Sequence, residues 1–146
     1  MARPWLYVGG KMLEAIPIGA VGAKSLVVEA EHTAAHWGSG SLYVLSTPHM
    51  VALMEGAAVG AVDQLLPEGY RTVGTRLDVR HLAATPMGQR VTARAELVQI
   101  DGRRLVFRVE ATDQAGTIGE GTHERYIVDN DRFMQRTLQK LEDLKK

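Results

Sequence analysis

Glu55 is the one charged side chain between Thr47 and Asp63, in a stretch that is otherwise almost entirely apolar. An ionised carboxylate in such surroundings costs free energy unless it is paired or hydrogen-bonded. Two interpretations of this pattern remain open. The carboxylate lies at a helix edge, where it reaches solvent or bonds to backbone, or it is retained for chemistry as a general base or nucleophile.

Thr47 and His81 are two further candidates for catalysis. Thr47 precedes Pro48, a pair typical of a helix N-terminus with Thr as the N-cap, where backbone N–H groups attract a developing oxyanion. Eight helical residues put Thr47 and Glu55 about 12 Å and about 80° apart, so they could flank one substrate without touching. His81 ends an expected strand. An isolated His is more often structural, but a pKa near ~6.5 makes it a natural general base.

Arg125 lies in an expected strand with apolar neighbours. It either forms an ion pair with Glu120 or Glu124, or provides a fork that binds a phosphate or a carboxylate. His32 and His36 are four residues apart, a spacing that suits a metal only on a helix. No helix or carboxylate motif is indicated there, so we expect no metal site.

The elements that must position these residues follow from periodicity. Residues 47–66 are apolar nearly all round and end at Pro67, which predicts a helix buried on most of its sides. Asp101 and Gly102 form a strong hairpin signal between two alternating strands. The other expected elements are a strand at 23–31, an irregular segment at 32–46, strands at 70–81 and 117–128 and a helical tail at 129–146. This order predicts an α+β fold in which an antiparallel sheet wraps a central helix, as in hotdog proteins.

Length and composition narrow the function classes. We expect an N-terminal arm at residues 1–17, with Pro4 and a Gly9-Gly10 break, and a single domain at 18–146. Lys plus Arg and Asp plus Glu number 17 each, so nothing draws the chain to nucleic acid or a membrane. The lack of cysteine excludes disulfides and a Cys nucleophile. With no signal peptide or spanning run, we expect a cytoplasmic protein.

Three stretches together resemble the fluoroacetyl-CoA thioesterase family of hotdog proteins. The first runs from Thr47-Pro48-His49 to Glu55, and the second from Val73-Gly74-Thr75 through His81 to Leu105. The third runs from Ile118 to Arg125. The resemblance covers roughly residues 19–137, and the spacings between the stretches also agree.

The resemblance implies a catalytic set of Thr47, Glu55 and His81, with Gly74 and Arg125 helping to hold the substrate. We also expect at least a homodimer with the site at its interface, because a single hotdog layer would leave an edge strand and part of its pocket open. We expect no cofactor beyond the CoA of the substrate. The family's fluoroacetyl-specific member carries a phenylalanine lid, which here falls on Gly38 and Ser41. We therefore expect hydrolysis of a small or medium acyl-CoA without fluoroacetyl specificity.

Two other functions remain possible on the same fold, because fold alone does not fix function. One is a non-catalytic module that binds acyl-CoA, against which the complete set of Thr47, Glu55 and His81 argues. The other is a hydratase or dehydratase, whose usual Asp-to-His spacing is not found in the sequence.

Overall fold

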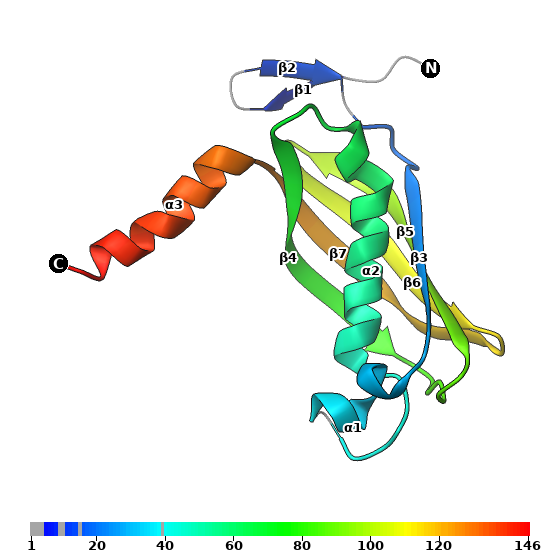
Figure 1. Ribbon diagram of the computed structural model, residues 1–146. Helices are drawn as coiled ribbons and strands as arrows, with labels where there is room; N and C mark the ends of the chain where they lie inside the picture. The colour runs from blue at the N-terminus through cyan, green and yellow to red at the C-terminus, as the bar shows by residue number, and fades with distance from the viewer. Residues whose placement is uncertain (1–4, 9–10, 15, 39) are drawn as a thin grey trace.

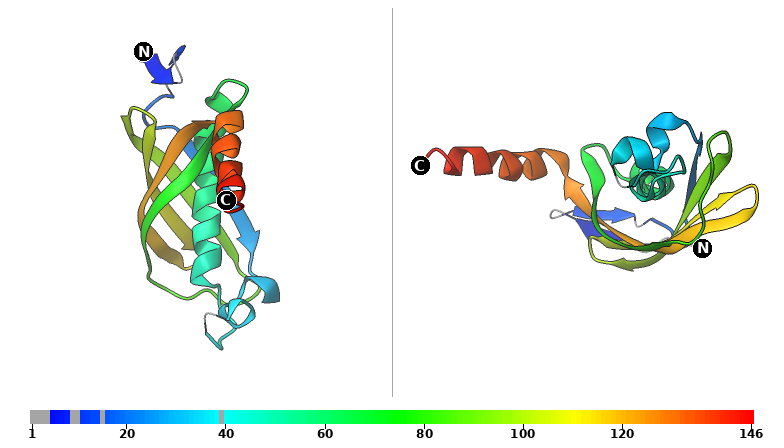
Figure 2. Two further views of the ribbon diagram at one scale, coloured as in Figure 1. Left: turned by 90° about the vertical axis from the view of Figure 1, so that its left-hand side faces the viewer. Right: turned by 90° about the horizontal axis from the view of Figure 1, so that it is seen from below.

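The computed structural model describes residues 5–8, 11–14, 16–38 and 40–146. Its body is a five-stranded antiparallel sheet in the order β3-β5-β6-β7-β4, curled around the long helix α2 (Figures 1 and 2). The strands are β3 (Val21–Val27), β4 (Tyr70–His81), β5 (Arg90–Asp101), β6 (Arg104–Asp113) and β7 (Gly116–Asp129). The predicted α+β layout, with a sheet wrapped around a central helix, is confirmed.

The sheet forms where the sequence alternates. Inward positions of β5 and β6 are fully buried, and they are Val91, Ala93, Ala95, Leu97, Leu105, Phe107, Val109 and Ala111. The two strands turn at Gly102, whose φ of +60° suits glycine, and Asp101 pairs with Arg104 across the hairpin. The β4–β7 pairing shifts register between Gly74 and Arg76, which leaves Thr75 as the extra residue of a bulge.

Helix α2 (Thr47–Val62) begins where the sequence predicted and ends four residues before the expected Leu66. Its N-cap is Ser46, whose Oγ accepts the N–H of His49 at 3.1 Å, so the assignment of Thr47 as the N-cap was wrong. Serine caps a helix at least as well as threonine, and Ser46 takes the extended backbone that a cap needs. The Thr47 hydroxyl is thereby free for another partner. A 3₁₀ turn, η2 (Asp63–Leu65), continues the helix.

Only one side of α2 packs in the sheet. Met50, Leu53 and Met54 are buried, and so are four residues nearer its C-terminal end, namely Ala57, Ala58, Ala61 and Val62. The prediction of a helix buried on most sides is only half right, because Ala52, Val59 and Gly60 are exposed. Small apolar residues are therefore exposed along this outer face.

The segment before α2 is more regular than predicted. The first sheet strand lies at Val21–Val27, earlier than the expected 23–31, because the chain turns into η1 (Ala30–His32). A one-turn helix α1 (Ala34–Trp37) follows within the segment expected to be irregular, capped by Thr33 and ended by Gly38 at φ +70°.

Two parts lie outside the curled sheet (Figure 1). Strands β1 (Trp5–Val8) and β2 (Lys11–Glu14) pair with each other, and Pro4, Gly9 and Gly10 of the expected arm lie outside the described residues. The predicted C-terminal helix is present as α3 (Asn130–Asp143), which projects away from the body and buries no residue. Among the described residues, no helix is both long and apolar enough to span a membrane.

Candidate active site

Thr47 and His81 are in direct contact, although 34 residues separate them in the chain. Thr47 is the first residue of α2, His81 is the last residue of β4, and the Thr47 Oγ lies 2.8 Å from the His81 Nδ1. Either atom can be the donor, depending on the tautomer of the imidazole. This contact, which we name the Thr47–His81 pair, links the start of the helix to the end of an edge strand.

The pair borders a pocket of about 320 Å³, whose lining residues are Ala34, Val44, Leu45, Thr47, His81, Leu82, Ala83 and Ala84. The Nε2 of His81 is buried and has no hydrogen-bond partner among the described residues. Burial lowers the pKa of His81, and an interaction with the Ala83 backbone offsets this in part. His81 is therefore neutral at pH 7, the state in which an imidazole can exchange a proton with a substrate.

Glu55 belongs to a second group of residues farther along α2. Its Oε2 lies 3.6 Å from Nη1 of Arg125, and its side chain is 40% exposed while that of Arg125 is 7% exposed. A Cβ added to Gly74 would lie 2.9 Å from this Oε2, so glycine gives the carboxylate room against β4. Of the two interpretations of Glu55, an edge carboxylate and a functional one, the ion pair to a buried arginine excludes neither.

Arg125 is held from three directions. Its Nε donates to Thr72 Oγ at 2.8 Å, its Nη2 donates to the Thr72 carbonyl at 3.0 Å, and its Nη1 lies 3.1 Å from His123 Nε2. Thr72 in turn donates its hydroxyl to Asp63 Oδ1 at 2.6 Å. We name Asp63, Thr72, His123 and Arg125 the Arg125 network.

Burial lowers the pKa of Arg125, and the carboxylates of Asp63 and Glu55 oppose that shift, so the guanidinium keeps its charge. Burial also lowers the pKa of His123. The Arg76 carbonyl opposes this shift, the Arg125 charge adds to it, and Glu55 and Glu124 oppose it. A neutral His123 beside a charged Arg125 is consistent with both shifts.

The predicted site residues thus fall into two groups. Thr47 contacts His81, whereas Glu55, Gly74 and Arg125 lie together, and among the hydrogen bonds of the described chain none joins the groups. Of the two interpretations of Arg125, the ion pair with Glu120 or Glu124 is not formed. Arg125 pairs with Glu55, and Glu124 pairs with Arg104.

Sequence reasoning missed Asp63, Thr72 and His123. A signal was present in β7, where every second residue from His123 to Ile127 is buried. A histidine and an arginine therefore occupy consecutive core-facing positions, and buried polar groups need partners. Asp63 and Thr72 carried no comparable signal, because each falls at an element boundary where polar residues are common.

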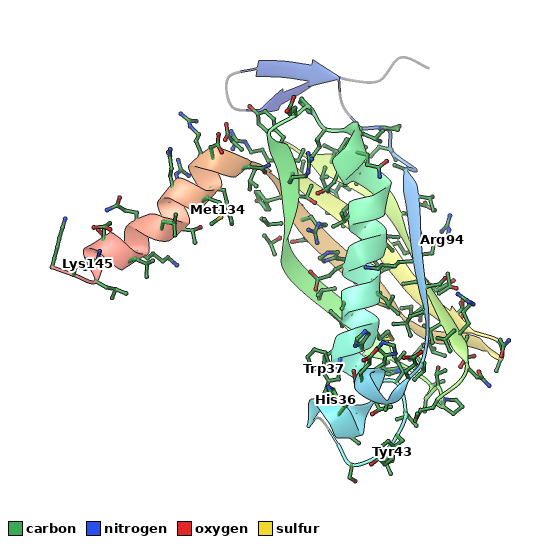
Figure 3. The ribbon with its side chains drawn as sticks, viewed as in Figure 1. His36, Trp37, Tyr43, Arg94, Met134 and Lys145 are labelled. Atoms are coloured by element: carbon green, nitrogen blue, oxygen red, sulfur yellow. The ribbon has the colours of Figure 1, made fainter. Side chains whose placement is uncertain are left out.

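Among the described residues, no group of three or more His, Cys, Asp or Glu side chains is arranged to hold a metal ion. His49 instead stacks edge-on with His32 and with Trp37, at centroid distances of 4.5 and 5.8 Å. Figure 3 shows Trp37 and His36 on α1 beside the start of α2, and Tyr43 on the following loop. Neither Trp37 nor Tyr43 lines the pocket beside the Thr47–His81 pair.

Comparison with known proteins gives concordant matches. The family model described as fluoroacetyl-CoA-specific thioesterase matches residues 28–131. The fluoroacetyl-CoA thioesterase of Streptantibioticus cattleyicolor is 45% identical over 97 residues, which cover 66% of this chain and 70% of that protein.

Two solved structures extend the similarity. One is the fluoroacetyl-CoA thioesterase FlK, with a TM-score of 0.80 and 37% identity, covering 86% of this chain and 98% of that one. Mutants of FlK have been solved in complex with acetyl-CoA and with fluoroacetate and CoA. The other is a hot-dog-like protein from Thermanaerovibrio acidaminovorans, with a TM-score of 0.79 and 28% identity, covering 86% of this chain and 93% of that one. The chain therefore belongs to the fluoroacetyl-CoA-specific thioesterase family and is a thioester hydrolase of the hotdog fold.

Proposed function

We propose that this protein hydrolyses small or medium acyl-CoA thioesters to the free acid and CoA, with Thr47, Glu55 and His81 as its catalytic residues. The observation that carries the proposal is the Thr47–His81 contact at the N-terminal end of α2, beside an open pocket. The acetyl-CoA bound to one FlK mutant, and the fluoroacetate and CoA bound to another, support the substrate class. The protein needs no cofactor beyond the CoA of its substrate, and such a substrate would place it in the cytoplasm.

The proposed reaction begins with the thioester carbonyl at the N-terminal end of α2. Pro48 has no N–H and His49 donates to the Ser46 cap, so Thr47 supplies the remaining N–H of the first three helical residues for the oxyanion. Glu55 takes a proton from water as the water oxygen bonds to the carbonyl carbon. The tetrahedral intermediate then breaks its C–S bond. The departing thiolate takes the proton that Glu55 removed from water, relayed through His81, so that Glu55 returns to the carboxylate and His81 to the neutral ring.

His81 suits this role through its hydrogen bond. If its Nδ1 accepts the Thr47 hydroxyl, the proton of the neutral ring is on Nε2, the nitrogen that the protein leaves without a partner. An alternative within the same proposal has the Glu55 carboxylate attack the carbonyl carbon and expel the CoA thiolate, which forms an anhydride. Water then cleaves the anhydride and regenerates Glu55, and the proton released protonates the thiolate. Solvent ¹⁸O labelling of the product and of Glu55 under single turnover separates the two routes.

We also propose that the enzyme is a homodimer that pairs through β4. This strand is an edge of the sheet, and the apolar outer face of α2 beside it is exposed. An antiparallel partner strand would bring the Thr47–His81 pair of one protomer towards the Glu55 group of the other. A shared site of this kind would explain why the three residues form two separate groups within one chain.

Mixing two inactive variants tests the shared site. Dimers formed from Glu55→Gln and His81→Ala chains, unfolded and refolded together, should recover about one quarter of the wild-type activity, because half are mixed and each has one intact site. Recovery of no activity would place all three residues in one protomer. Sedimentation that shows a stable monomer at micromolar concentration would contradict the dimer itself.

The acyl specificity follows from the segment before α2. Gly38 ends α1, Ser41 is exposed, and Trp37 is 53% exposed with its Nε1 bonded to the Glu31 carbonyl at 3.1 Å. These residues do not close the pocket as a bulky apolar lid would, so we propose a broad acyl range without fluoroacetyl selectivity.

A thiol-release assay across fluoroacetyl-, acetyl-, butyryl- and phenylacetyl-CoA tests the function as a whole. We expect turnover of several of these thioesters by the wild-type protein. Binding of acyl-CoA without release of thiol from any of them would contradict the proposal and indicate a binding module instead.

A further inference from the structure

Arg125 is positioned inside the protein rather than presented to a ligand. Each of its three guanidinium nitrogens has a partner within the chain, and its side chain is 7% exposed. The group that reaches solvent from this cluster is Glu55, which is 40% exposed and lies on the Nη1 side of the guanidinium. Arg125 therefore contacts the carboxylate that faces the site.

The acceptors of Arg125 are themselves fixed by further bonds. The hydroxyl proton of Thr72 goes to Asp63 Oδ1 at 2.6 Å, so its lone pairs face the Nε of Arg125. The Asp63 Oδ2 also accepts the Thr72 N–H at 3.2 Å. The Nδ1 of His123 lies 2.8 Å from the Arg76 carbonyl, to which it can only donate, and this leaves Nε2 to accept from Arg125.

We infer that Asp63, Thr72 and His123 are positioning residues that orient the Arg125 guanidinium so that Nη1 holds the Glu55 carboxylate in its working geometry. Arg125 thus acts on the reaction through Glu55. This inference rests on the proposed catalytic role of Glu55.

A purely structural role explains the network less well. A buried ion pair with its polar partners is often no more stable than well-packed apolar side chains of similar volume. Yet His123 and Arg125 occupy core-facing positions next to Ile127, and Thr72 and Asp63 are also buried. Arg125 contacts the partly exposed carboxylate of Glu55, and the other three residues are linked to that carboxylate through Arg125. Gly74 leaves room for the carboxylate, because a Cβ at this position would crowd it.

Two matched threonine variants provide the first test. Thr72 and Thr85 are both buried, and each donates its hydroxyl to an aspartate, Asp63 at 2.6 Å and Asp113 at 2.8 Å. Thr72→Val should lower kcat by about 10- to 100-fold with little change in KM, because it removes an Arg125 acceptor. Thr85→Val controls for the loss of one buried hydroxyl–carboxylate bond.

The deciding measurement is a double-mutant cycle with Glu55→Gln. Thr72→Val and His123→Phe should each lower kcat strongly in the wild-type background and by less than about twofold in the Glu55→Gln background. Thr85→Val should lower kcat by the same factor in both. His123→Gln, which keeps an acceptor and a donor, should lower kcat less than His123→Phe does. Equal factors for Thr72→Val in the two backgrounds would overturn the inference.

A second measurement needs no turnover. In wild-type protein labelled with ¹⁵N at histidine and arginine, NMR should show the Nδ1–H tautomer of His123 and a protected Nε–H of Arg125, and the latter protection should be lost in Thr72→Val. An Nε2–H tautomer would overturn the inference, since that nitrogen could not then accept from Arg125. If the wild-type protein turns over no thioester, the proposed function is contradicted. The tautomer of His123 tests the orientation of Arg125 independently of that result.

Discussion

The Thr47–His81 pair joins α2 to β4, and the Arg125 network joins β7 to β4 and η2, but the two differ in how completely their polar atoms are bonded. In the pair, one hydrogen bond joins the two side chains, and the second nitrogen of His81 has no partner among the described residues. In the network, every nitrogen of Arg125 and both nitrogens of His123 have partners. The pair borders a pocket, whereas the network is buried.

This difference separates two tasks that active sites combine. An atom that reacts must have bonding capacity left for the substrate, whereas an atom that positions must have its bonding capacity filled by the protein. Glu55 lies at the boundary, since one oxygen faces Arg125 while the side chain remains partly exposed. The comparison therefore predicts that substitutions in the pair lower turnover with little loss of stability, whereas substitutions in the network lower stability as well as turnover.

The largest expected effect is on turnover in Glu55→Gln. This nearly isosteric change removes the negative charge, so kcat should fall by about two to four orders of magnitude while the fold is kept. Single-turnover kinetics and circular dichroism on the same sample measure both quantities. Activity within about twofold of wild type would mean that Glu55 is structural and does not take part in the reaction.

His81→Ala and Arg125→Lys should differ in how much stability they lose. His81→Ala should lower kcat by about 100-fold and the free energy of unfolding by less than about 1 kcal/mol. Arg125→Lys should lower the free energy of unfolding by about 3 kcal/mol, because lysine leaves Thr72 and His123 without donors. Urea titrations and kinetics on both variants test this. Similar losses of stability in the two would contradict the distinction.

The sequence predicted the fold in some detail and the site in part. Alternation in residues 91–97 and 105–111, with the turn at Gly102, was enough to place the central hairpin and its buried face. The charge of Glu55 in an apolar helix identified it without any knowledge of its partner. Such patterns are local, so they could be recognised from spacing alone.

The partners of Glu55 and Arg125 could not be predicted in this way. They depend on how β4 pairs with β7, where the register shifts between Gly74 and Arg76. They depend also on which carboxylates form ion pairs with other residues, as Glu124 does with Arg104. Thr47 was assigned as the helix cap because a suitable residue preceded proline, yet Ser46 suits the cap equally and the hydroxyl of Thr47 bonds to His81.

A smaller effect is expected in substrate choice. Without a bulky residue at Gly38 or Ser41, kcat/KM for fluoroacetyl-CoA should exceed that for acetyl-CoA by about tenfold or less, and butyryl- or phenylacetyl-CoA should be accepted better. Steady-state kinetics on the four thioesters measure these ratios. A preference for fluoroacetyl-CoA above about 10³-fold, or more than about 4 kcal/mol, would show that another part of the chain selects the acyl group.

The smallest expected effect is a fall in stability below neutral pH. Burial lowers the pKa of His49, His81 and His123 in the folded protein below the ordinary value of about 6.5. The unfolded chain therefore binds more protons as the pH falls, and the free energy of unfolding should decrease from pH 7 to pH 5.5. Urea titrations across this range test the sign. His123→Gln should show a shallower decrease, and a stability that rises on acidification would contradict the burial of neutral histidines.

The bulge at Thr75 has a consequence for the permitted length of β4. Side chains of a regular strand alternate between its two faces, so Gly74 and His81, seven positions apart, would point opposite ways. Their partners in β7, Arg125 and Gly119, are only six residues apart, because Thr75 has no partner in that strand. The extra residue thus changes the phase of the strand and brings the end of β4 onto the face that Thr72 and Gly74 share. Deletion of Thr75 would leave Gly74 and His81 six positions apart in a regular ladder, so His81 should keep its place opposite Gly119 and still face Thr47, with the Arg125 side unmoved.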